Sequence, residues 1–155
     1  MKKKLIIIYI VCLFFLVGCD NKEEIVKNNY MEMRNKLLEK DNYTNAEDLP
    51  LDIIVDIIRE EEIIKYKIDL KNPKENMKDI VAIVVHNYYN ENLFPTIGIF
   101  DEKQKLLTTE KNKVLELEDT IDTTKDISKI NLEIKIWIKY KNDLNEEKEV
   151  IYKTT

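Results

Sequence analysis

The fold class is decided by one stretch near the end of the chain: Ile130-Asn131-Leu132-Glu133-Ile134-Lys135-Ile136-Trp137-Ile138-Lys139-Tyr140. Apolar residues alternate in it with mainly polar ones, and a period of two places successive side chains on opposite faces of a strand. The same alternation runs through residues 64–70. Both stretches therefore predict strands that turn one face to a core and the other to water.

Five further strands are predicted at residues 52–59, 78–86, 96–100, 114–118 and 147–153, separated by segments rich in Asn, Asp, Lys and Pro. Seven short strands without long helices between them predict a mainly β fold. The expected architecture is an antiparallel β-sandwich of immunoglobulin-like or fibronectin-like type over residues 51–155. The paired cysteines of a true immunoglobulin domain are absent from this stretch.

A single amphipathic helix is predicted upstream, over residues 23–40, with an apolar stripe formed by Val26, Tyr30, Met33 and Leu37. Two of the predicted strands need a cover, because residues 80–85 are apolar on both faces and residues 53–58 are nearly so. We therefore expect the helix stripe to pack on the outer face of one sheet. Self-association of a sheet face is the alternative.

The N-terminus carries an export signal. Three lysines at residues 2–4 precede an apolar run of 13 residues, Leu5 to Val17. Such a run fits the core of a signal peptide and is shorter than the roughly 20 residues that span a bilayer as a helix. Residues 1–18 are therefore predicted to be removed from the mature protein.

The run ends in Leu16-Val17-Gly18-Cys19, which resembles the lipobox of bacterial lipoproteins. The resemblance covers residues 1–19 only. It implies that Cys19 receives a diacylglycerol and becomes the first mature residue, so that residues 19–50 form a lipid-anchored N-terminal segment on the extracytoplasmic face of the cell membrane. The alternative is an ordinary secretory signal in which the cysteine occurs by chance.

The mature charge is acidic. Removal of residues 1–18 deletes three lysines, so 22 basic residues face 30 acidic ones and the formal charge changes from −5 to −8. Nucleic acids and anionic lipids bind preferentially to basic surfaces, so the acidic charge argues against both as partners of the domain.

Reactive side chains are scarce in the mature part, which has one His (His86), one Ser (Ser128) and one Gly (Gly98). Neither a Ser-His-Asp triad, a zinc site nor a glycine-rich phosphate loop can be assembled from this inventory. The acidic run at residues 60–62 alternates between faces if it is extended, and no calcium-loop pattern occurs. The sequence therefore predicts a protein without a cofactor, a metal or an enzymatic activity.

Two features are candidates for binding. The segment at residues 86–95 gathers His86, Tyr88, Tyr89 and Phe94, whose rings could stack on a sugar or a peptide. Its alternative is a loop that returns Leu93 and Phe94 to the core. Trp137 falls by alternation on the polar face of its strand, where it would be either an interface residue or covered by the helix or a neighbouring strand.

These features predict a non-catalytic binding or interaction module, anchored to the membrane by lipid, that recognises an unknown envelope protein or polymer. A structural or accessory subunit of an envelope complex is the alternative, with the Trp137 face as its docking surface. A small carboxylate-dependent enzyme is a third hypothesis, which would require a deep pocket with two converging carboxylates.

Overall fold

The computed structural model describes residues 22–88, 93–122 and 130–154. The predicted signal peptide, Cys19 and Tyr89 therefore lie outside the described residues. Within these three ranges, no helix is both long enough and apolar enough to cross a membrane.

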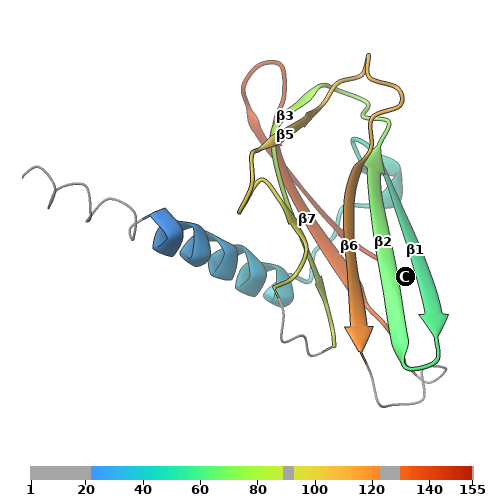
Figure 1. The fold of residues 1–155 in the computed structure, drawn as a ribbon. Coiled ribbons are helices and arrows are strands. Elements are labelled where there is room, and N and C mark those ends of the chain that lie inside the picture. Colours follow the sequence, from blue (N-terminus) through green and yellow to red (C-terminus); the bar gives the residue numbers. More distant parts are fainter. Residues whose placement is uncertain (1–21, 89–92, 123–129, 155) are drawn as a thin grey trace, which may run out of the picture.

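Two antiparallel sheets form the body of the molecule (Figure 1). The smaller sheet has the order β1-β2-β6, with bounds β1 (Asp52–Glu60), β2 (Ile63–Lys71) and β6 (Leu115–Asp122). The larger sheet has the order β4-β3-β7-β8, and a further short strand, β5, also pairs with β3. Its bounds are β3 (Met77–His86), β4 (Thr96–Ile97), β5 (Gln104–Leu106), β7 (Ile134–Lys141) and β8 (Glu147–Lys153). The predicted mainly β, antiparallel sandwich is confirmed.

The alternating patterns build the main core between the sheets. In β2 the apolar set of residues 64, 66, 68 and 70 is buried, whereas Lys65 is exposed. In β7 the side chains of Ile134, Ile136 and Ile138 enter the same core. A period of two thus places one row from each strand in the interior, as the sequence predicts.

Several strand bounds differ from the prediction, and β6 extends to Asp122, beyond the expected end at residue 118. The strand expected over residues 96–100 ends at Ile97, because Gly98 has a φ of +69° and turns the chain. The chain then returns to β3 as β5, which was not among the predicted strands. β7 begins at Ile134 rather than at residue 130, although Ile130 is still buried and its carbonyl accepts a hydrogen bond from Arg59.

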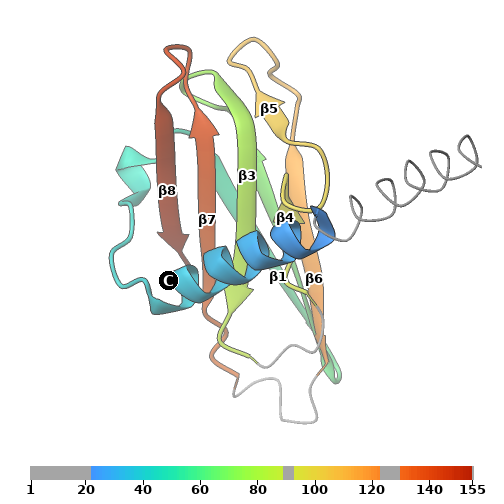
Figure 2. The ribbon, with the colours of Figure 1, turned by 90° about the vertical axis from the view of Figure 1, so that its left-hand side faces the viewer.

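The helix spans residues 22–39 and lies across the outer face of the larger sheet (Figure 2). Tyr30 and Leu37 are buried, and Met33 packs partly buried beside them. These side chains form a second apolar cluster with residues of β3, β7 and β8, namely Ile83, Val85, Trp137 and Ile151, and with Phe94. The expected docking of the helix stripe is confirmed for Tyr30, Met33 and Leu37, whereas Val26 lies outside this cluster.

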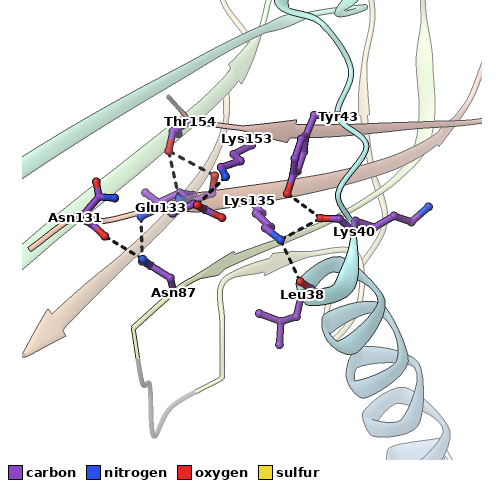
Figure 3. Close-up of polar contacts among 10 residues, drawn as sticks. Leu38, Lys40, Tyr43, Asn87, Asn131, Glu133, Lys135, Lys153 and Thr154 are labelled. Carbon is purple, nitrogen blue, oxygen red and sulfur yellow. Dashed lines mark hydrogen bonds and ion pairs between the residues drawn. The ribbon is translucent and has the colours of Figure 1, made fainter.

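A strand residue caps the end of this helix (Figure 3). The ammonium group of Lys135, on β7, donates to the backbone carbonyls of Leu38 and Lys40, each at 3.0 Å. The Tyr43 hydroxyl donates to the Lys40 carbonyl as well, at 2.7 Å. The last carbonyls of a helix have no partner within it, so these donors replace water there. The chain then passes through a short 3-10 turn, η1 (Ala46–Asp48), to β1.

Candidate functional site

His86 ends β3 and is 3% exposed. Its ring stands edge-on to Tyr66 and to Phe94, with ring centroids 5.7 Å and 5.0 Å away. Its Nδ1 accepts a hydrogen bond from the backbone amide of Tyr88, at 3.2 Å. Burial lowers the pKa of His86, and the charge of Asp119 offsets part of this effect. The imidazole is therefore a neutral packing group in the wall of the core.

Phe94 is also buried. Its backbone amide donates to the Tyr30 hydroxyl at 2.9 Å, and the Arg34 guanidinium lies over its ring, 5.6 Å from the centroid. Tyr88 is half-buried against the main core, while Leu93 is 58% exposed. The expectation that Leu93 and Phe94 both return to the core is right for Phe94 and wrong for Leu93, because only the Phe94 ring is held under the helix.

Trp137 is 3% exposed, and this corrects the interpretation of it as an exposed interface residue. It does face outward from β7, but the helix covers it. The Lys139 ammonium lies over the indole, 4.3 Å from the ring centroid, and the indole N–H donates to the Glu149 carboxylate at 3.2 Å. A partner cannot reach this ring while the helix is docked.

The predicted binding residues therefore do not form one surface. Phe94 and Trp137 belong to the cluster beneath the helix, and His86 packs against Phe94. Their aromatic rings stabilise the contact between the helix and the larger sheet. The contact needs large apolar side chains on the outer face of a sheet, where polar side chains are usual. The sequence pattern singles these residues out for that reason.

The outer face of the smaller sheet is a better candidate, because neither the helix nor the larger sheet covers it (Figure 1). The strand register sets its rows across β1, β2 and β6: Ile54-Asp69-Glu116, Asp56-Lys67-Glu118 and Ile58-Lys65-Thr120. Ile58 is 54% exposed, and Ile54 is exposed on the same face of this edge strand, with Asp56 between them. Two apolar side chains thus border a polar face.

A shallow groove of about 920 Å³ crosses this face, lined among others by the side chains of Asp56, Ile58, Lys65 and Glu118. The lysines are engaged within the face: Lys65 pairs with Glu60 at 3.1 Å, and Lys67 pairs with Glu116 at 2.6 Å. The hydrogen bond to Glu116 raises the pKa of Lys67. The remaining carboxylates leave the groove with an excess of negative charge.

The sequence carries the signal for this surface but does not tell which of the two sheets the helix covers. The near-continuous apolar run at residues 53–58 indicates a second apolar face on β1, and the helix was the expected cover for one such strand. The helix covers β3, and β1 lies in the other sheet. Ile54 and Ile58 therefore stay in water, which costs free energy unless a partner covers them.

No family model matches this chain, and no curated protein matches it. In the described ranges, no group of three or more His, Cys, Asp or Glu side chains is placed to hold a metal ion. The interpretation of function therefore rests on the surface of the molecule itself.

Proposed function

We propose that the chain is a lipid-anchored, extracytoplasmic interaction module without catalytic activity. The lipobox-like Leu16-Val17-Gly18-Cys19 after a charged and apolar signal supports the anchor at Cys19. Two or three acyl chains suffice for stable membrane attachment, since each buried CH₂ contributes about 0.8 kcal/mol. The sandwich is then held close to the membrane and presents its surfaces to other envelope components.

One observation carries the binding role: the helix covers the outer face of the larger sheet, whereas the outer face of β1-β2-β6 stays open, with Ile54 and Ile58 exposed at its edge. Exposed isoleucines among charged residues indicate a docking surface, because leaving them in water costs free energy. Within the described residues, β1 is hydrogen-bonded to β2 alone and is the edge of its sheet.

The partner we infer is an extended, cationic segment of an envelope protein. An edge strand offers backbone donors and acceptors to an added strand, and its exposed side chains select the sequence of that strand. Ile54 and Ile58 would contact apolar residues of the added strand, and the Asp56 carboxylate between them would attract lysine or arginine, within the negative charge to which Glu118 contributes. On the face that it shares with Ile54, Asp56 and Ile58, such a strand would carry an apolar, a basic and an apolar residue at every second position.

The register argues against an enzymatic use of the same groove. Lys67 lies between Asp56 and Glu118 across the three strands. Two carboxylates separated by an ammonium group do not form the pair that general acid and base catalysis of glycoside hydrolysis needs. The role of structural subunit, in turn, loses its support because Trp137, its expected docking residue, is buried.

Two experiments test the proposal. Labelling of cells with a palmitate analogue should modify the full chain, and Cys19→Ser should abolish the label and release the protein from the membrane fraction. Capture from solubilised envelopes should recover a partner with a basic, apolar segment. Ile58→Lys should reduce this recovery by about tenfold or more, because it removes an apolar contact and adds a repelling charge. Leu144→Lys, on the exposed turn between β7 and β8, is the matched control and should not change the recovery.

A labelled Cys19 with equal capture by both lysine variants would contradict the proposed surface. An unlabelled Cys19 would contradict the anchor.

A further inference from the structure

A second exposed apolar patch lies at the N-terminal end of the helix. Phe100 is 48% exposed and Leu93 is 58% exposed, and both border a groove of about 550 Å³ with Val26 of the helix. Lys22 and Lys27 line the same groove, together with Glu23. Ile25, on the same helical turn, is exposed as well. The patch thus combines residues from three segments of the chain. We call it the anchor-end patch (Val26, Leu93 and Phe100).

The fold holds this patch in place. Phe100 lies against Tyr30, with ring centroids 5.3 Å apart. Its loop is fixed by Gly98, whose amide donates to the Asp101 carboxylate at 2.6 Å. A Cβ at Gly98 would lie 2.5 Å from the Ile80 carbonyl oxygen, so the loop packs tightly on β3. Leu93 precedes Phe94, whose amide is bound by Tyr30. Two apolar side chains are therefore kept in water by a well-anchored backbone.

The position of Cys19 indicates what covers the patch. Three peptide units separate Cys19 from Lys22, so their Cα atoms lie at most about 11 Å apart whatever the conformation between them. This inference rests on the proposed lipid anchor: if Cys19 carries acyl chains, the membrane surface lies within this reach of the start of the helix. The anchor-end patch borders on the same end of the helix.

We infer that the anchor-end patch inserts into the membrane interface beside the lipid anchor and so fixes the orientation of the domain. Apolar side chains flanked by Lys22 and Lys27 have the character of an interfacial contact, in which apolar groups enter the headgroup region and long basic side chains extend to the phosphates. The rest of the mature chain is acidic, so other faces gain little from such a contact.

This orientation agrees with the proposed binding surface. The helix lies on the larger sheet, and the open face of β1-β2-β6 is on the opposite side of the sandwich (Figures 1 and 2). Both views also place the turn between β7 and β8, which carries Leu144, away from the N-terminal end of the helix. A contact through the anchor-end patch therefore leaves the open face accessible from the aqueous side.

Fluorescence quenching of the lipidated full-length protein tests the inference. The variant Phe100→Trp is reconstituted into phosphatidylcholine vesicles with either natural or brominated acyl chains, and Leu144→Trp is the matched control. Trp137 is buried in both variants and contributes the same background. Brominated chains should reduce the emission of the new Trp at position 100 by about half or more and leave that at position 144 unchanged. Leu93→Trp, a probe on another segment, should behave as Phe100→Trp does.

Equal, weak quenching at positions 93, 100 and 144 would overturn the inference. If mass spectrometry finds acyl chains on Cys19 and the protein floats with the vesicles in that case, the anchor stands and only the orientation is wrong. If Cys19 carries no lipid, the proposed anchor fails, and the inference fails with it.

Discussion

The side-chain ammonium of Lys135 lies 3.0 Å from the backbone carbonyl oxygen of Leu38, although 97 residues separate the two in the sequence. The same ammonium binds the Lys40 carbonyl, so one strand residue completes the C-terminal end of the helix (Figure 3). A positive charge is favourable there because the unpaired carbonyls carry partial negative charge. The contact fixes the end of the helix on the larger sheet, while the anchor-end patch occupies its other end.

Lys135→Met should therefore loosen the helix. The loss of a charged donor to two carbonyls should lower the free energy of unfolding by about 1–2 kcal/mol. Hydrogen exchange should accelerate more at the amides of residues 30–39 than at those of β2. The control Lys148→Met removes an exposed lysine whose one ion pair among the described residues is with Glu146, and it should change the free energy of unfolding by less than about 0.5 kcal/mol. Equal effects of the two variants would contradict the capping role.

Leu37→Ala tests the apolar contact between the helix and the sheet. Leu37 is fully buried in the cluster that contains Trp137 and Ile151. Truncation of a buried Leu should lower the free energy of unfolding by about 2–5 kcal/mol, measured by denaturant titration. Leu144 is 76% exposed, so Leu144→Ala should cost less than about 0.5 kcal/mol. A small loss for Leu37→Ala would show that the helix is not docked in solution.

Tyr30→Phe removes the acceptor of the Phe94 amide and keeps the ring. The amide is left buried without a partner, which should cost about 1–3 kcal/mol of the free energy of unfolding. Tyr152 is the matched control, since its ring packs against the main core and its hydroxyl makes no hydrogen bond within the described part of the chain. Tyr152→Phe should be nearly neutral in the same titration, and an equal loss in both variants would argue against the Tyr30 bond.

His86 should make the stability depend on pH. Burial lowers its pKa in the folded state, whereas the unfolded chain has a pKa of about 6.5 for His. The unfolded state therefore binds more protons than the folded state below about pH 6.5. The contribution of His86 to the free energy of unfolding is complete above this pH and is lost as the pH falls toward the lowered pKa. Because one proton is involved, the free energy of unfolding changes by at most about 1.4 kcal/mol per pH unit.

The variant His86→Phe should have a smaller slope between pH 6.5 and 5.5, measured as the free energy of unfolding at each pH. Identical slopes in the variant and the parent protein would show that His86 is already protonated in the folded state or is exposed to water.

Much of the fold could be predicted from the sequence because β2 and β7 each have one apolar and one mainly polar row. The alternation in β2 and β7 indicates which side of each strand is buried, and the stripe with Tyr30 and Leu37 indicates the same for the helix. The structure shows these sides buried. Periodicity does not report how strands pair. The strand β5 was missed because Gln104-Lys105-Leu106 is too short to show a pattern and is formed by its contact with β3.

The candidate site could be predicted less well, since exposure depends on which elements lie side by side. Trp137 and Ile58 are both large apolar residues on outer strand faces, but only Trp137 lies in the sheet that the helix covers. From the sequence pattern alone, the same degree of burial is expected for both residues. The pairing of β1 with β2 rather than with β3 decides that Ile58 is exposed and Trp137 is not.

The central claim is that the open face of β1-β2-β6 binds a cationic segment of an envelope protein, and site-specific photo-crosslinking in intact cells tests it most directly. A photoreactive residue is placed at position 58 or, as the control, at position 144, and the adducts are mapped by mass spectrometry. We predict an adduct from position 58 only, joined to a partner segment that carries basic and apolar residues at every second position. Adducts of equal yield from both positions, or an acidic segment joined to position 58, would contradict the claim.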